Sequence, residues 1–238
     1  MAAGGTLMPR GSFDRSARRA STRASLLEAA ARVYARRGFS GATLNEVAAE
    51  AGFTKGAVYD HFGSKENLLL ALWEEYLADQ IAEQLALFDR GRDSWERPLA
   101  GSARWMELLE HDPDPFRLFV ELWVYAQREE RLRSRLAGAL GALAQTFAGF
   151  AETTASDTGL DPPPGANERF GTVTLALGIG LPMLRLLDPA SVPSSLLGAV
   201  VSVLVRAAEA DPAAMELLAG GEALTAGAAP SPPRQRAG

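Results

Sequence analysis

The chain has 238 residues, of which 47% are hydrophobic and 22% are charged, and its formal net charge is −5. This apolar content excludes a wholly disordered chain, and the length is ample for a sizeable buried core. The sequence contains no cysteine, which excludes disulfide scaffolds, thiolate metal sites and a cysteine nucleophile. Two histidines are too few for a multi-histidine metal centre within one chain, and we expect neither a metal nor a cofactor.

The charges are divided unevenly along the chain. Residues 1–67 contain ten basic and six acidic residues, whereas the remainder is strongly acidic. The only two lysines, Lys55 and Lys65, both lie in this basic stretch. A basic segment on an acidic chain indicates a polyanionic partner at one end, although a chance distribution of surface charge would give the same count.

No stretch has the pattern of a membrane span or of a secretion signal. The longest uncharged runs cover residues 170–184 and 189–205, which is shorter than the roughly 20 residues that a span needs. The first 19 residues contain four arginines and lack the apolar core of a signal peptide. We therefore expect a cytoplasmic protein without a membrane partner.

Helices are predicted along the whole chain and strands nowhere, because apolar residues recur at spacings of three and four and do not alternate. Three helices are predicted over residues 18–37, 44–51 and 55–61, and a long fourth helix starts at residue 65. The expected fold is all-α, with a three-helix N-terminal head on a larger helical body. The predicted divisions are a disordered tail over 1–17, the head over 18–80, the body over 81–218 and a second disordered tail over 219–238.

Two short helices joined by a tight turn form a helix-turn-helix pattern in the head. Thr43 and Glu46 have the spacing of a capping box at the start of the first helix, and Gly52 ends it. Phe53 is expected to lock the two helices together, and Thr54 to cap the second one. The second helix would then lie in the major groove of DNA. The alternative is an ordinary αα-corner, and the local basic charge favours the DNA interpretation.

The stretch TLNEVAAEAGFTKGAVYDHFGSKENL, from Thr43 to Leu68, closely resembles the TetR family of bacterial transcriptional regulators. The resemblance covers about residues 20–76 and is long and ungapped. It implies an all-helical homodimer, usually a repressor that a small-molecule effector releases from double-stranded DNA at a palindromic operator. It also implies a recognition helix from Lys55 to His61 and a fourth helix that links the DNA-binding head to a ligand-binding and dimerisation body.

The resemblance also assigns roles to individual residues by matched position. The implied phosphate contacts are Thr43, Tyr59, His61 and Lys65. The implied groove-facing set is Lys55, Gly56, Ala57 and Asp60, with Thr54 at the start of their helix. Asp60 departs from the family pattern, which often has an aromatic residue or a histidine there. An acid at this position would be repelled by phosphate, could accept from a cytosine amino group, or could pair with a nearby basic side chain.

Aromatic residues concentrate in the first part of the body, which favours a small-molecule pocket between helices. Ordinary aromatic core is the alternative for any single ring. The hypothesis is that a mostly apolar effector binds here, shifts the fourth helix and lowers the affinity for DNA. The predicted ligand-binding set is Trp73, Tyr76, Trp105, Phe116, Phe119, Glu121, Trp123 and Phe147.

Residues 167–209 form two nearly uncharged predicted helices in which small residues recur. In a monomer they would expose a large apolar patch, whereas pairing with the same helices of a second chain would bury it as a four-helix bundle. The family's usual dimer interface lies in the corresponding place. We expect Leu197, Val201 and Leu204 near the two-fold axis, with a hairpin buried inside one chain as the alternative.

The rival functions are a helical-bundle enzyme and an interaction module that does not bind DNA. The sequence has no P-loop, no Rossmann fingerprint and no Glu-x-x-His pair of the kind that holds a di-iron centre. An interaction module would leave the clustered basic residues of the head unexplained. The sequence therefore favours a DNA-binding regulator that is not an enzyme.

Overall fold

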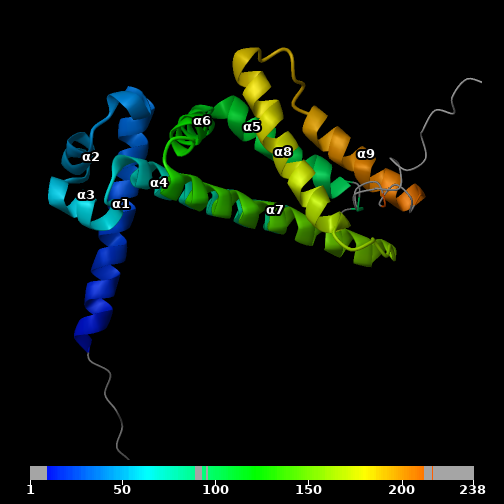
Figure 1. Ribbon diagram of the computed structural model, residues 1–238, viewed down its shortest axis with the longest axis horizontal. Helices are drawn as coiled ribbons and strands as arrows, with labels where there is room; N and C mark the ends of the chain where they lie inside the picture. Colours follow the sequence, from blue (N-terminus) through cyan, green and yellow to red (C-terminus); the bar gives the residue numbers. More distant parts are fainter. Residues whose placement is uncertain (1–9, 89–92, 95, 212–215, 217–238) are drawn as a thin grey trace, which may run out of the picture. The chain divides into compact units, whose positions relative to one another are not determined.

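The computed structural model describes residues 10–88, 93–94, 96–211 and 216 (Figure 1). Within these ranges the secondary structure is helical and contains no strand, which confirms the expected all-α fold. The helices are α1 (Arg10–Gly41), α2 (Leu44–Ala51), α3 (Lys55–Phe62), α4 (Lys65–Phe88), α5 (Glu96–His111), α6 (Asp114–Ala126), α7 (Glu130–Thr158), α8 (Ala166–Leu187) and α9 (Leu196–Ala210).

The largest difference from the predicted boundaries is at the start of α1. This helix begins at Arg10, eight residues before the predicted start at Arg18, so residues 10–17 of the stretch expected to be a disordered tail are helical. Gly38 has a left-handed φ of 66°, which interrupts the helix close to its predicted end. Residues 1–9 and the predicted tail over 219–238 lie outside the described part of the chain.

The chain forms two compact units. The first, here called the head, contains residues up to 80 together with 112–138, and the second, here called the body, contains 81–111 and the residues from 139 onward. The head therefore includes α6 and the start of α7, which the sequence division at residue 80 assigned to the body. That division followed chain order, whereas α6 packs against α1, far from it in the sequence.

The core of the head forms around one face of α1. Apolar residues at helical spacing form a buried stripe on this helix, and they are Leu26, Leu27, Ala30, Val33 and Tyr34. Aromatic contacts then bring in α6. Phe119 stacks on Trp73 of α4 with 4.5 Å between ring centroids, and Tyr125 meets Phe39 edge-on at 4.9 Å. These contacts explain why α6 belongs to the head.

The core of the body forms where α9 packs against α5 and α8. Phe170 of α8 joins Leu197, Val201 and Val205 of α9 in one buried cluster. Trp105 of α5 packs against this cluster, and its indole N–H donates to the Gly178 carbonyl oxygen at 3.1 Å. The inward face of α9 is thus covered by its own chain.

Among the described residues, α8 is the one helix long and apolar enough to cross a membrane, with a mean hydropathy of 1.6 over its most apolar stretch. The sequence prediction counted uncharged runs only, whereas α8 also includes Arg169 and Arg185. Length and composition do not by themselves indicate insertion, because an apolar helix covered by other protein passes the same test. Only 17% of the stretch is buried inside the chain, so its own chain leaves much of this surface uncovered.

Replacing Gly171 of α8 by alanine is expected to destabilise the body strongly. A Cβ atom at this position would overlap the Ala144 carbonyl oxygen of α7 and lie 2.8 Å from the Ala148 amide nitrogen, and both are backbone atoms that cannot swing aside. We expect a loss of about 1–3 kcal/mol or more in the free energy of unfolding, which lowers the midpoint of thermal unfolding by several degrees. Circular dichroism on heating measures it.

Gly178, on the same helix, provides the matched control for this substitution. A Cβ atom there meets nothing within 4 Å, so Gly178→Ala should leave stability unchanged or raise it by up to about 1 kcal/mol. Equal melting midpoints for Gly171→Ala and Gly178→Ala would contradict the close approach of α7 and α8.

Candidate nucleic-acid interface

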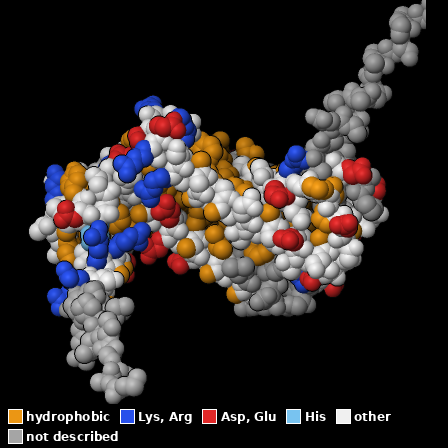
Figure 2. Space-filling view, turned by 60° about the horizontal axis from the view of Figure 1, so that its bottom comes forward, with side chains coloured by type: hydrophobic (Ala, Val, Ile, Leu, Met, Phe, Trp, Pro, Cys, Tyr) orange, Lys and Arg blue, Asp and Glu red, His pale blue; other side chains and the backbone are white. Residues whose placement is uncertain are grey.

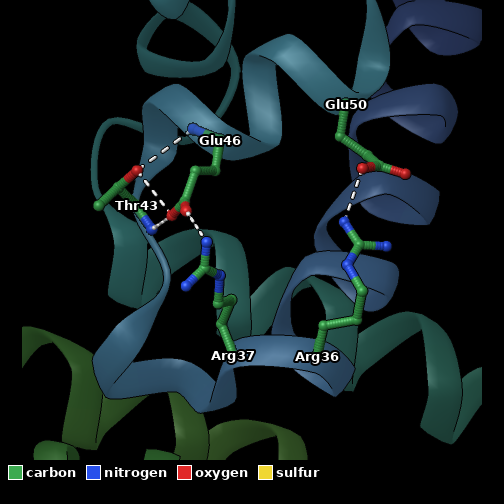
Figure 3. Close-up of polar contacts among 5 residues, drawn as sticks. All are labelled: Arg36, Arg37, Thr43, Glu46 and Glu50. Carbon is green, nitrogen blue, oxygen red and sulfur yellow. Dashed lines mark hydrogen bonds and ion pairs between the residues drawn. The ribbon is translucent and has the colours of Figure 1, made fainter.

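A reciprocal capping box fixes the start of α2, as the sequence predicts (Figure 3). The Thr43 hydroxyl accepts a hydrogen bond from the Glu46 amide at 3.2 Å, and the Glu46 carboxylate accepts one from the Thr43 amide at 2.9 Å. The hydrogen bond from the Thr43 side chain, followed by that from its backbone, lowers the pKa of Glu46. The capping box therefore holds the Thr43 side chain in place at the N-terminus of α2.

A tight turn leads from α2 to α3. Gly52 ends α2 with a left-handed φ of 74°, and its amide donates to the carbonyl oxygens of the preceding turn, as predicted. Phe53 was expected to lock the two helices together, but the residue is 37% exposed and does not belong to the buried core. The fully buried residues of α2 and α3 are instead Val47 and Val58, which lie on the inner faces of the helices.

The outer surface of α3 carries most of the residues predicted to contact DNA. Thr54 caps the helix, and its hydroxyl accepts a hydrogen bond from the Ala57 amide at 3.3 Å. Val58 and Phe62 are the buried residues of α3. The predicted contact residues are exposed or half-buried, and they are Lys55, Gly56, Ala57, Tyr59, Asp60 and His61.

A groove of about 470 Å³ lies beside the exposed face of α3. The Lys55 ammonium lies 5.4 Å from the centre of the Tyr59 ring, and the Lys65 ammonium donates to the Ser40 carbonyl oxygen at 3.4 Å. The groove thus brings together four of the predicted contact residues from three elements. Its lining consists of Ala42, Thr43, Leu44, Asn45, Lys55, Tyr59, Gly63, Ser64, Lys65 and Glu66.

Two helix N-termini line this groove. The first residues of α2 and of α4 both belong to its lining, and Ser64 caps α4 by accepting from the Asn67 amide at 3.1 Å. Backbone amides at a helix N-terminus and the positive end of the helix dipole both favour anions. Together with two lysines and the hydroxyls of Thr43 and Tyr59, they suit a phosphate backbone, although Glu66 opposes this field.

Arginine–glutamate ion pairs neutralise part of the positive charge counted in the head (Figure 3). Glu50 of α2 accepts from Arg36 at 2.6 Å and from Arg32 at 3.0 Å, and Arg37 lies 3.4 Å from Glu46. The hydrogen bonds from Arg36 and Arg32 lower the pKa of Glu50. These three arginines therefore pair with α2, and sequence counting overestimated their contribution to a polyanion site.

His61 lies in the last turn of α3, close to positive charge from α1. Partial burial lowers its pKa, and the charges of Arg19 and Arg23 lower it further, whereas Asp60 opposes the shift. Arg23 also lies over the Phe62 ring, 5.7 Å from its centre, and pairs with Glu75 at 3.4 Å. The first half of α1 therefore lies next to the end of the predicted recognition helix.

The predicted ligand-binding residues divide between the two units. In the head, Trp73 stacks on Tyr76 and Phe119, and Phe119 also contacts Phe116 and Trp123. The indole N–H of Trp73 is buried and has no hydrogen-bond partner. Glu121 also belongs to the head, where its carboxylate approaches Gly38, while Trp105 and Phe147 lie in the body. Six of the eight residues therefore belong to one compact unit.

The predicted dimer residues are largely covered by their own chain. Leu197 and Val201 are buried against Phe170, and Leu204 is half-buried. The buried positions lie on the face of α9 that packs against α5 and α8. From the sequence alone, this face cannot be distinguished from one that packs against a second chain. The large apolar residues that remain exposed on α8 and α9 are Met183, Leu184, Leu187 and Val203.

Comparison with known proteins identifies the class of the head, whose three helices and tight turn have the architecture of a helix-turn-helix domain. The family described as "Bacterial regulatory proteins, tetR family" matches residues 26–72.

No group of three or more histidine, aspartate or glutamate side chains that could hold a metal occurs in the described part of the chain.

The proteins similar to this chain include two curated relatives and one solved structure. The transcriptional activator FasR of Mycolicibacterium smegmatis is 31% identical over 42% of this chain and 45% of its own length. The transcriptional repressor AcnR of Corynebacterium diphtheriae is 34% identical over 44% of this chain and 57% of its own length. Thermus thermophilus FadR, a TetR-family repressor crystallised with lauroyl-CoA, matches with a TM-score of 0.62 and 19% identity over 77% of this chain and 92% of that one.

Residues 26–72, which lie in the head, therefore match the TetR family of bacterial regulatory proteins, and the two relatives are similar to this chain over less than half of its length. Its similarity to the two relatives spans about half of their length, and the likeness to FadR is one of fold. The two named relatives are transcriptional regulators, the class of protein that the sequence predicts.

Proposed function

We propose that this protein is a sequence-specific DNA-binding transcriptional regulator that acts as a homodimer on a palindromic operator. The observation that carries the proposal is the groove beside α3, where Thr43, Lys55, Tyr59 and Lys65 come together with the N-termini of α2 and α4. Such a groove fits one strand of the DNA backbone while α3 enters the major groove. One named relative is an activator and another is a repressor, so the direction of regulation is itself part of the proposal, and we propose repression.

The test of this function is binding to DNA that flanks the protein's own coding sequence, searched first for an inverted repeat. We expect nuclease protection of two half-sites about 34–36 Å apart or a further whole turn apart. A shuffled duplex of the same length is the control, and the protein should bind it at least about 10³-fold more weakly. Equal affinity for both duplexes would contradict sequence-specific recognition.

Lys65→Ala should weaken binding to every DNA sequence alike. Lys65 lines the groove at the start of α4, where its ammonium suits a phosphate oxygen and not a base edge. Each half-site loses one phosphate contact, which should lower the slope of log affinity against log salt by about 0.9. A dimer has two half-sites, so the slope should fall by about two in all. A titration at several salt concentrations measures the slope, and an unchanged slope would exclude the contact.

Melting of the Lys65→Ala variant is the necessary control. The Lys65 ammonium also lies 4.4 Å from the Phe39 ring and donates to the Ser40 carbonyl oxygen, so its loss could loosen the turn before α2. Lys65→Arg keeps the charge and should retain most of the salt slope. A variant that melts like the wild type and still loses salt dependence supports the phosphate contact.

The dimer of this proposal forms through the outer faces of α8 and α9. On α8, the exposed residues Ala176, Gly180, Met183, Leu184 and Leu187 recur at spacings of three and four, which places them on one face. Val203 is exposed on α9 as well. A second copy of the same surface would cover this apolar patch, which a monomer would leave in water.

A small, mostly apolar effector is proposed to bind at the aromatic cluster of the head. Trp73, Phe119 and Trp123 form the cluster, and the unpartnered Trp73 N–H suits a ligand with one hydrogen-bond acceptor. Because Trp73 belongs to α4 and Phe119 to α6, a ligand wedged between them would move helices that pack with α1. Such coupling is typically ~1–3 kcal/mol, enough for a roughly 5- to 150-fold loss of DNA affinity.

Tryptophan fluorescence should report this effector. Lauroyl-CoA is the first probe, because its lauroyl chain is the apolar part expected to enter the cluster and the solved structure of FadR from T. thermophilus holds it. An effector at the cluster should change the emission and release DNA over the same concentration range, and Phe119→Ala should weaken both effects equally. A compound that releases DNA without changing the emission, and that still acts on Phe119→Ala and Trp123→Ala, would locate the effector site elsewhere.

A further inference from the structure

The first half of α1 is a basic helix that extends past the rest of the head (Figure 1). Arg15, Arg18, Arg19 and Arg23 are exposed on it, and we call residues 15–23 the basic arm. In the space-filling view, lysine and arginine side chains gather on the surface that the head contributes (Figure 2).

Three arginines of the basic arm lie on the same side of α1 as the apolar residues that this helix buries in the head core. Arg15, Arg19 and Arg23 are four residues apart, so they lie on one face of the helix. Leu26 and Ala30 follow Arg19 and Arg23 by seven residues each, which is close to two helical turns, and both are buried in the core of the head. The face that packs apolar residues against the head therefore carries arginines where α1 passes beyond that core.

The position of the arm relative to α3 is fixed by contacts at its inner end. Arg23 lies over the Phe62 ring at the end of α3 and pairs with Glu75 of α4 at 3.4 Å. The charges of Arg19 and Arg23 also act on His61 in the last turn of α3. The arm thus starts beside the C-terminal end of the recognition helix, while the groove of Lys55 and Lys65 lies beside its N-terminal half.

We propose that the basic arm is a second phosphate-binding surface, which contacts the duplex backbone flanking each half-site and so extends the interface beyond the helix-turn-helix. The inference rests on the proposed DNA-binding function. Arg15, Arg18 and Arg19 make the flanking contacts, and Arg23 anchors the arm to α3 and α4. Guanidinium groups bind phosphate well, and such contacts add affinity and salt dependence without reading base sequence.

The test compares the full-length protein with the triple variant Arg15→Gln, Arg18→Gln and Arg19→Gln. Glutamine keeps the helix propensity of arginine, so the arm should stay helical. We expect each lost phosphate contact to lower the salt slope by about 0.9, giving a loss of up to about three per protomer. The ratio of affinities for operator and shuffled duplex should stay unchanged. In hydroxyl-radical footprints, protection should disappear at the outer edges and persist in the centre of each half-site.

A matched variant controls for net charge. Arg117→Gln, Arg128→Gln and Arg131→Gln remove the same charge from exposed positions on α6, α7 and the turn between them. This control should leave the salt slope and the footprint as in the wild type. The proton resonances of His61 provide a check that does not depend on DNA, because Arg19→Gln should raise the pKa of His61 towards its ordinary value.

The outcomes separate the inference from the function on which it rests. An arm variant with the wild-type slope and footprint, or a control variant with an equal loss of slope, overturns the basic arm and leaves the DNA-binding regulator standing. A wild-type protein that binds neither the operator duplex nor the shuffled one at about 50 mM salt overturns both, because non-specific binding is strong at that salt concentration.

Discussion

Leu184→Glu combined with Val203→Glu is expected to convert the proposed dimer into monomers and to reduce operator affinity by about 10²- to 10⁴-fold. Leu184 is 54% exposed and Val203 is 63% exposed within the chain, so charges there face water in the monomer and would be buried only against a second copy. A dimer gains affinity by binding two half-sites at once, and a monomer loses that gain. Sedimentation measures the assembly, and a fluorescence-anisotropy titration measures the affinity.

Val201→Glu is the informative contrast to this double variant. Val201 is buried against Phe170 inside the body, so a carboxylate there lacks both water and a partner. This variant should unfold at a lower temperature, whereas the Leu184→Glu and Val203→Glu variant should melt as a stable monomer. A double variant that stays dimeric at micromolar concentration would show that another surface forms the dimer.

Lys55→Ala is expected to cost ~1–3 kcal/mol per half-site and to relax the preference at one base position, most readily a guanine. Lys55 is exposed in the first turn of α3, where the recognition helix of this motif reaches base edges. With two half-sites in a dimer, the loss of operator affinity should be about 30-fold at the least and about 10⁴-fold at the most. Titration of a panel of operator variants measures both effects.

The groove offers an alternative role for Lys55, which the same titration resolves. Its ammonium lies over the Tyr59 ring and shares the groove with Lys65, a position from which it could also reach phosphate. A base contact predicts that the operator is weakened more than a shuffled duplex. Equal weakening of the two duplexes, together with a lower salt slope, would assign Lys55 to the backbone.

Local sequence signals were sufficient for the helix-turn-helix. The capping box of Thr43 and Glu46, the left-handed Gly52 and the cap at Thr54 depend on residues at most five positions apart, so their spacing alone specified the geometry found in the head. The buried face of α1 followed from the helical period for the same reason. Phe53 was misjudged because exposure depends on which neighbours fill a space, and not on the residue's apolar character.

Long-range packing decided what local signals could not. The grouping of α6 with the head depends on contacts such as that between Phe39 and Tyr125, which are 86 positions apart in the chain. On α9, the sequence identified an apolar helix but not which face its own chain covers, and the structure buries Leu197 and Val201 while leaving Val203 exposed. Arg32, Arg36 and Arg37 counted as free positive charge until the fold placed glutamates of α2 beside them.

The sequence by itself therefore determined the all-helical class, the helix-turn-helix motif and the residues on the outer surface of α3. Each of these follows from residue spacing within one or two helical turns. Tertiary structure alone decided which charges remain available, which apolar faces stay uncovered and which aromatic rings meet. The physical reason is that burial and ion pairing depend on distances between segments remote in the chain, and a helical period specifies only the direction in which each side chain leaves its own helix.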